Sequence, residues 1–188
     1  MASPQILFDG PADAPLTVAL AHGAGAPMDS PFMAAFAEGL AAEGFRAARF
    51  EFPYMVRRRE TGTRKPPDRG PVLLDTWSAV IRDLGPENLV IGGKSMGGRM
   101  ASMLAAEGNA VAAQDVAGVI ALGYPFHPPG KPEKTRIDHL PALTAPVLVC
   151  QGERDPFGKP DEVSDYGLPE RVQLHWLPSG DHDFKPLK

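Results

Sequence analysis

The sequence predicts an α/β fold built on a mostly parallel sheet of about six or seven strands, with helices on both faces and no cap domain. Short and nearly continuous apolar runs alternate with segments whose apolar residues recur at helical spacing. This alternation is typical of parallel strands that are buried between two layers of helices. Most of the apolar runs end in polar or glycine-rich turns, and ligands in such sheets gather at the carboxyl ends of the strands.

The length and composition indicate one soluble domain spanning residues 1–188. Apolar residues at 43% and charged residues at 22% are ordinary for a globular protein with a substantial core. The net charge of −4 gives no electrostatic reason to expect a nucleic acid partner, and no run approaches the about 20 apolar residues of a membrane span. The single cysteine, Cys150, excludes an intrachain disulfide. Because residues 1–15 also lack a signal-peptide profile, we expect a cytoplasmic protein with no nucleic acid and no membrane partner.

Three strands and two helices are predicted in the first half of the chain. The strands cover residues 5–8, 16–21 and 45–52. The first helix begins at Ser30 and Pro31, which suit an N-cap and a first turn, and it ends at Gly44. The second helix ends at Gly85. Its apolar stripe consists of Leu73, Trp77, Val80, Ile81 and Leu84.

Residues 53–71 lie between the third strand and the second helix and are expected to form one long irregular loop. Six basic residues occur there among prolines and glycines: Arg57, Arg58, Arg59, Arg64, Lys65 and Arg69. Such a run is usually a solvated loop, and this is the default interpretation. Because the loop leaves the carboxyl end of a predicted strand, a second interpretation stays open, in which the cations of residues 57–69 attract an anionic substrate.

Residues 88–100 contain the pattern Gly93-x-Ser95-x-Gly97 between a buried apolar run and a helical pattern. A serine on a sharp turn between a strand and a helix is the arrangement of a catalytic nucleophile. The flanking glycines remove side chains that would clash in that turn, and the helix start places partial positive charge near the hydroxyl. We therefore predict Ser95 as a nucleophile. The methionines of the following helix are expected to pack in the core: Met96, Met100 and Met103.

The second half of the chain supplies a base and an acid for this serine. Strands are predicted over residues 118–122, 147–151 and 172–177. Asp155 follows the second of these strands and His182 follows the last, so both belong to the same edge of the sheet as Ser95. His182 would take the serine proton during attack, and Asp155 would hold the imidazole in the required tautomer. The order along the chain predicts a Ser95–Asp155–His182 triad.

The oxyanion formed on attack needs preorganised N–H donors. We expect one from the backbone of Met96, directly after the nucleophile, and one from Ala24, in the loop after the first long strand. This loop contains Gly23-x-Gly25, but Met28 occupies the third glycine position of a dinucleotide fingerprint. No paired His or Cys residues have the spacing of metal ligands. We therefore expect no metal and no cofactor.

With these motifs the chain resembles the α/β-hydrolases, and within them the small lidless branch related to the dienelactone hydrolases, with the testis-expressed 30-like and NSL-complex-subunit-3-like proteins. The matching segments are HGAGAPMDS (22–30), FEFPY (50–54), GGKSMGGR (92–99), GYPFHPPGK (123–131), QGERDPFG (151–158) and GDHD (180–183). The resemblance implies the same triad. This chain departs from the pattern in two places: dienelactone hydrolases use a cysteine where it has Ser95, and a helix usually follows the catalytic histidine where it has residues 183–188.

The leading functional hypothesis is a serine hydrolase that cleaves an ester or thioester of a small acyl substrate through an acyl-enzyme. Lids of this fold are commonly inserted in the connection that here covers residues 123–145, which is short and rich in proline. We therefore expect an open cleft, lined by Tyr124, Phe126 and His127. The alternative is an interaction module that kept the fold with little or no catalysis, since the resemblance includes a subunit of a chromatin-modifying complex and fold does not fix function.

The last predicted strand alternates apolar with polar residues, so at least one of its faces needs apolar cover. Val172, Leu174 and Trp176 form the apolar face. A helix around residues 161–166 is one source of that cover. A second copy of the chain is the other, in a two-fold homodimer that places the same patch on both partners.

Overall fold

One sheet of seven strands organises the protein. The computed structural model describes residues 4–106, 113 and 115–187. The strands are β1 (Ile6–Asp9), β2 (Thr17–Ala21), β3 (Arg46–Phe50), β4 (Leu89–Lys94), β5 (Gly118–Leu122), β6 (Val147–Gly152) and β7 (Val172–Leu177). The helices are α1 (Pro31–Ala42), α2 (Pro53–Thr61), α3 (Gly70–Leu84), α4 (Met96–Leu104) and α5 (Pro160–Ser164), and residues Leu140–Ala142 form the 3-10 turn η2.

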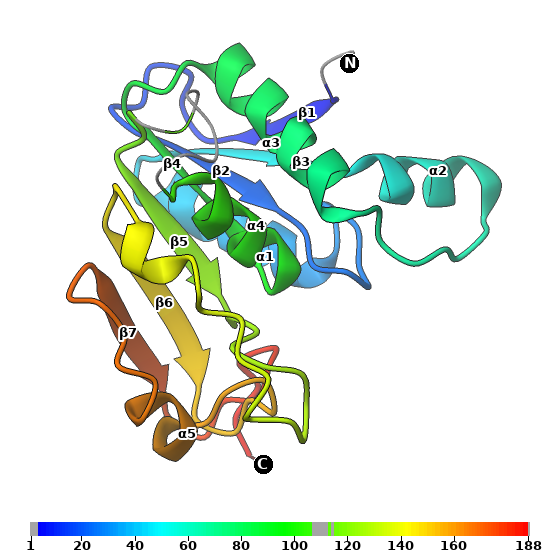
Figure 1. The fold of residues 1–188 in the computed structure, drawn as a ribbon. Helices are drawn as coiled ribbons and strands as arrows, with labels where there is room; N and C mark the ends of the chain where they lie inside the picture. The colour runs from blue at the N-terminus through cyan, green and yellow to red at the C-terminus, as the bar shows by residue number, and fades with distance from the viewer. Residues whose placement is uncertain (1–3, 107–112, 114, 188) are drawn as a thin grey trace.

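The strand order in the sheet is β1-β3-β2-β4-β5-β6-β7 (Figure 1). β1 runs antiparallel to β3, with Ile6 opposite Phe50. All other neighbouring strands are parallel, so the carboxyl ends of β2 to β7 meet at one edge of the sheet. The predicted mostly parallel sheet is confirmed, and β4 extends beyond the apolar residues 89–91 as far as Lys94.

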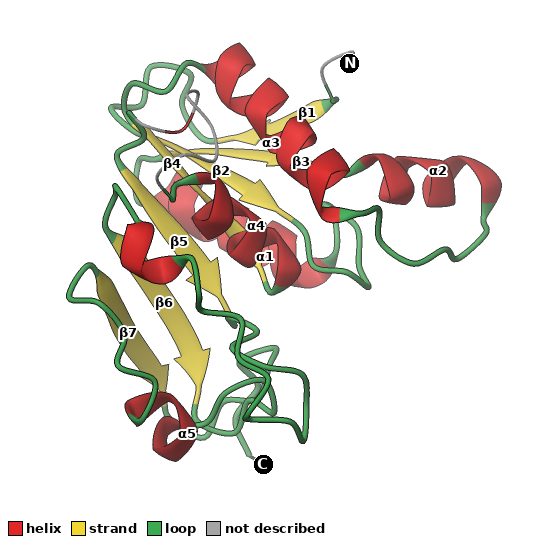
Figure 2. Ribbon diagram, viewed as in Figure 1, coloured by secondary structure: helices red, strands yellow, loops and turns green. Residues whose placement is uncertain are grey.

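Helices cover both faces of the sheet, with α3 and α4 on one face and α1 on the other (Figure 2). In the larger core cluster, Trp77 of α3 and Met100 of α4 are buried with Ile91 of β4. In the smaller cluster, Met33 of α1 is buried with Leu20 of β2. Among the residues that the structure describes, no helix has both the length and the apolar character that a membrane crossing requires.

Residues 53–71 depart from the prediction, because α2 occupies the first part of this segment and α3 begins near its end. Gly62 ends α2 in the left-handed conformation, with φ 69°, which glycine adopts readily. Within α2 only Tyr54 and Met55 are buried. The expectation of one long loop was wrong because a helix with so few buried residues lacks the apolar periodicity that marks the other helices.

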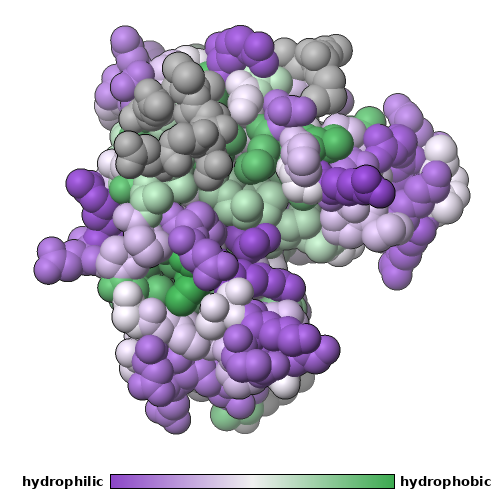
Figure 3. Space-filling view, viewed as in Figure 1, coloured by the Kyte–Doolittle hydropathy of each residue, from purple (hydrophilic) through white to green (hydrophobic). Residues whose placement is uncertain are grey.

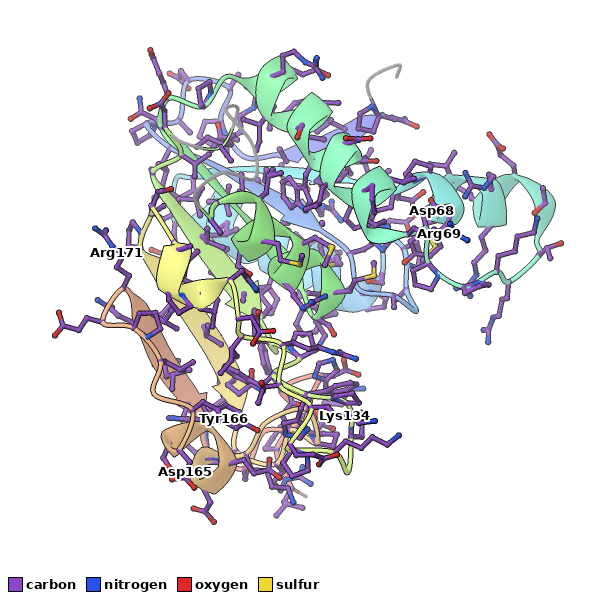
Figure 4. All side chains as sticks on the ribbon, in the orientation of Figure 1. Asp68, Arg69, Lys134, Asp165, Tyr166 and Arg171 are labelled. Carbon is purple, nitrogen blue, oxygen red and sulfur yellow. The ribbon has the colours of Figure 1, made fainter. Side chains whose placement is uncertain are left out.

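α2 projects from the body of the protein as an arm (Figure 1) with a mainly hydrophilic surface (Figure 3). Ion pairs fix the arm on both sides. Arg57 pairs with Asp68, which Figure 4 labels where the chain returns to α3. Arg59 pairs with the buried Glu51 at 2.6 Å and with Asp29 at 2.9 Å. The arginines of this segment therefore connect the arm to the body.

The apolar face of β7 is partly covered by the protein's own chain, because Val172 is buried and Leu174 and Trp176 are half-buried. Leu174 and Trp176 pack against the main core cluster. Val163 of α5 belongs to this cluster, and Tyr166 and Leu168 pack against it. The helix expected near residues 161–166 is thus one of the elements beside this face, while the homodimer stays a prediction.

α4 lies close to the sheet because glycine occupies its first turn. A Cβ atom at Gly98 would lie 2.6 Å from the carbonyl oxygen of Gly93 and 3.0 Å from the Cα atom of Ala121. Real Cβ atoms do not approach backbone oxygens so closely. Any side chain at Gly98 would therefore move α4, together with the turn that precedes it, away from the strands.

Two glycine substitutions within helices separate this packing effect from helix propensity. Gly98→Ala should lower the free energy of unfolding by about 1–3 kcal/mol, because the added methyl overpacks the contact with β4. Gly39→Ala is the matched control: its Cβ would meet no atom within 4 Å, so it should raise the free energy of unfolding by about 0.5–1 kcal/mol. Urea denaturation measures both values. Effects of the same sign would contradict the close approach of α4.

Candidate active site

Ser95 occupies a strained turn between β4 and α4. Its φ and ψ angles are 49° and −112°, outside the regions that L-residues normally populate. The Ser95 N–H donates to the carbonyl of Leu122 at 2.9 Å, and the Ser95 carbonyl accepts from the Arg99 N–H at 3.0 Å. Such strain costs about 1–3 kcal/mol and persists only where the surrounding structure enforces it, most often at functional sites.

His182 and Asp155 form a hydrogen-bonded pair at the same edge of the sheet. Asp155 follows β6 and is fully buried, and its Oδ2 atom lies 2.7 Å from His182 Nδ1. Its Oδ1 atom accepts from the Phe157 N–H at 2.9 Å. In the neutral ring, a buried carboxylate at Nδ1 favours the tautomer that carries the proton there, and Nε2 is then free to act as an acceptor.

Ser95 and His182 line one pocket of about 320 Å³. The other lining residues are Gly23, Ala24, Gly25, Ala26, Ser30, Phe32, Met33, Lys94, Phe157 and Asp183. Phe157 packs against the imidazole of His182, with ring centroids 4.5 Å apart. The sequence did not identify Phe157 or Lys94 as site residues. Lys94 directly precedes Ser95, and Phe157 lies two residues after Asp155.

Tyr124, Phe126 and His127 do not lie on the wall of this pocket, so the expectation that they line the cleft is corrected. Their exposed fractions are 1%, 0% and 1%. The Tyr124 hydroxyl donates to the carbonyl of Arg136 at 3.0 Å, and Phe126 packs against the Tyr124 ring. The loop is held in this position by buried hydrogen bonds, such as that from the Tyr124 N–H to Oε1 of Gln151 at 2.7 Å, and its side chains therefore point into the core.

The loop after β2, residues 22–30, is held by side chains from distant parts of the chain. The Phe52 N–H donates to Nε2 of His22 at 3.1 Å, so the His22 proton resides on Nδ1, which donates to the carbonyl of Gly23 at 2.7 Å. The Tyr54 hydroxyl donates to the Ala24 carbonyl at 3.1 Å. This part of the pocket wall is therefore fixed by the residues that lead from β3 into α2.

Charged side chains hold the far end of the same loop. Buried Glu51 accepts from the Met28 N–H at 3.2 Å, and Arg49 donates to the Met28 carbonyl at 3.0 Å. Arg58 donates to the Gly25 carbonyl at 3.0 Å. Together with the ion pair between Arg59 and Glu51, these contacts give the basic segment a structural part in the site; attraction of an anionic substrate stays a prediction.

Comparison with known proteins shows the family and the fold of the chain. Residues 14–188 match the model of a family described as alpha/beta hydrolase domain. A serine hydrolase without a lid from Xanthomonas campestris is 23% identical, with a TM-score of 0.70 over 95% of this chain and 80% of that one. A dienelactone hydrolase from Anabaena variabilis is 23% identical, with a TM-score of 0.71 over 96% and 82%. These structures share the fold, and the resemblance to the testis-expressed 30-like branch stays a prediction.

The buried His22 makes stability depend on pH. Burial lowers its pKa, so below about pH 6.5 the unfolded chain takes up a proton that the folded protein refuses. The free energy of unfolding should therefore decrease as the pH is lowered below this value, by at most about 1.4 kcal/mol per pH unit. His22→Gln, which keeps an acceptor for Phe52, should be less stable at pH 7.5 but show a shallower fall.

Chemical denaturation between pH 7.5 and 5 measures both slopes. His139, whose pKa is lowered to about 4 mainly by burial, contributes in the same direction to all variants. His175→Gln, at an exposed position of β7, is the control and should keep the wild-type slope. Parallel curves for His22→Gln and the wild type would show that His22 does not titrate in this window.

Proposed function

The chain belongs to the α/β-hydrolase family, and on this premise we propose that it is a serine hydrolase that cleaves an ester or thioester of a small acyl substrate. The observation that carries the proposal is the strained Ser95 in one pocket with the Asp155-bound His182. The substrate acylates Ser95, and water then releases the acid. We further propose a cytoplasmic location, with no partner needed for the reaction.

In the proposed mechanism, Nε2 of His182 removes the Ser95 proton as the hydroxyl attacks the substrate carbonyl. The resulting imidazolium lies against the buried Asp155 carboxylate, which stabilises its charge. The same proton then passes to the leaving alcohol or thiol, and the acyl-enzyme forms. In the second half, His182 activates a water molecule, and the tetrahedral intermediate collapses to return Ser95.

The backbone N–H groups of Met96 and Ala24 are the proposed oxyanion donors. Met96 is the first residue of α4, so its N–H has no acceptor within the helix. Ala24 lines the pocket that contains Ser95, and its own carbonyl is held by Tyr54. Donors fixed in advance cost little reorganisation when charge develops on the substrate oxygen.

The pocket supports a small acyl group as substrate. Its volume of about 320 Å³ lies at the lower end of the range for small-molecule sites. Phe32, Met33 and Phe157 provide apolar wall. The connection over residues 123–145, where a lid would be inserted, contains only the short turn η2, so no cap domain encloses a longer chain.

An interaction module with the same fold would have no need of the strained Ser95. Strain at one residue lowers stability, and selection for binding alone gives no reason to keep it together with an acid–base pair in the same pocket. The enzyme is therefore favoured over the interaction module.

The proposed triad predicts a steep and non-additive loss of activity. Ser95→Ala, His182→Ala and Asp155→Asn should each lower esterase kcat about 10³-fold or more, and double variants should lose little beyond the single ones because the three residues act as a unit. Ser164→Ala, at an exposed serine of α5, is the matched control. Labelling by a fluorophosphonate should disappear in Ser95→Ala and persist in the control. Most of the wild-type activity in Ser95→Ala would exclude this function.

The small open site also predicts substrate length dependence. Esters of two to four acyl carbons are expected to have a higher kcat/KM than those of ten or more, because the pocket has no enclosed continuation. A p-nitrophenyl ester series measures this order. Without a lid, no rise in rate should accompany the appearance of micelles or droplets, and interfacial activation would contradict the prediction.

A further inference from the structure

Lys94 is the last residue of β4 and directly precedes Ser95. Its exposed fraction is 8%, although it lines the pocket. The side chain passes two glycines. A Cβ atom at Gly23 would lie 3.3 Å from Lys94 Cγ, and one at Gly123 would lie 3.1 Å from Nζ. Side chains at either position would therefore obstruct the path of the lysine.

The ammonium group of Lys94 reaches the loop that carries the proposed base. Nζ donates to the backbone carbonyl of His182 and lies 3.5 Å from the carboxylate of Asp183. It also lies 4.8 Å from the ring centroid of Phe32 and 5.5 Å from that of Phe184, within the range of cation–π contacts. A carbonyl, a carboxylate and two aromatic faces thus compensate the loss of water around a buried charge.

No direct sheet contact connects the proposed nucleophile and the proposed base. Ser95 follows β4 and His182 follows β7, and two strands lie between them in the sheet. The flanks of the His182 loop are held elsewhere: Arg154 donates to the carbonyls of Ser179 at 2.7 Å and Lys185 at 3.1 Å. In the described part of the chain, the only side-chain hydrogen bond to the backbone of residue 182 comes from Lys94.

We propose that Lys94 is a positioning residue, whose charged side chain fixes the backbone of His182 at a set distance from the neighbouring Ser95. The Asp155 carboxylate orients the imidazole ring, while Lys94 places the residue that bears it. This role rests on the proposed hydrolase function. It gives the lysine no contact with the reacting atoms, and its loss should affect the rate of acylation more than substrate binding.

The charge matters as well as the hydrogen bond. Burial lowers the pKa of Lys94, while the carboxylates of Asp183, Asp155 and Asp181 oppose this effect. Lys94 therefore loses its proton at a lower pH than an exposed lysine, and the ion pair and cation–π contacts are lost with it. The contribution of the lysine to activity is present below its folded pKa and falls as pH rises through that value.

The test compares Lys94→Met, Lys94→Arg and a matched control, Lys185→Met. Lys185 approaches the same Asp183 carboxylate, at 3.8 Å, but its side chain is 75% exposed. Lys94→Met should lower kcat about 10- to 100-fold, since small displacements of reacting groups cost this much, with KM within about threefold. Lys185→Met should leave both constants within about twofold of the wild type. Circular dichroism and urea denaturation establish that each variant is folded.

Lys94→Arg tests whether the charge is needed, because a purely structural role would not change the dependence of kcat on alkaline pH. A guanidinium keeps its proton at alkaline pH, so this variant should recover part of the lost kcat and shift the alkaline limb of the kcat profile upward. If Lys94→Met does not fold, Asp183→Asn weakens the same contact from the other side and should lower kcat about two- to fivefold, with KM unchanged. A folded Lys94→Met with wild-type kcat would overturn the inference, as would an unshifted alkaline limb in Lys94→Arg. If only the inference about Lys94 is wrong, the wild-type protein should still be labelled by a fluorophosphonate at Ser95. If the hydrolase proposal itself is wrong, this labelling should be absent.

Discussion

The backbone of Ser95 is the constraint around which the rest of the site is arranged. A non-glycine residue at φ 49° needs support from both sides of the turn. The sheet provides it through the Leu122 carbonyl, and α4 provides it by lying against the strands without an intervening side chain at Gly98. The strained turn thus depends on a buried contact between α4 and the sheet, where displacement of either element has a high cost.

The pocket wall formed by the 22–30 loop is held mainly by hydrogen bonds and ion pairs. The 22–30 loop has little apolar anchoring beyond Met28, and polar contacts hold its carbonyls at several points. Glu51 is central to them, because it is 3% exposed and contacts both Arg59 and the Met28 N–H. A buried carboxylate of this kind is retained only with such partners, so the α2 arm and the pocket loop form one electrostatic unit.

Much of this architecture could be predicted from local patterns. The strands, and the positions of Ser95 and Asp155 at strand ends, were accessible because strand periodicity and strand-end positions are properties of short segments. α2 was not predictable because polar contacts of its arginines hold it in place, such as those of Arg59 with Asp29 and Glu51, and apolar periodicity does not reveal such contacts. The loop after β5 was interpreted wrongly because Tyr124 and Phe126 follow the packing of their surroundings, not their nearness to the site. Lys94 was missed for a related reason: its contacts join residues 88 positions apart.

The wall of the pocket combines segments that lie far apart in the chain. Phe184 packs against Phe32 and Phe36 of α1, with ring centroids 5.5 and 5.9 Å apart, and this contact joins the wall after β2 to the His182 loop. During synthesis, the turn that carries Ser95 leaves the ribosome long before His182, its proposed base. Under the proposed mechanism, a nascent chain completes most of its sheet before that base is in place, and activity would begin only when the last segment docks. A single proteolytic cut between β7 and His182 would reverse that step and leave nearly all of the fold in place.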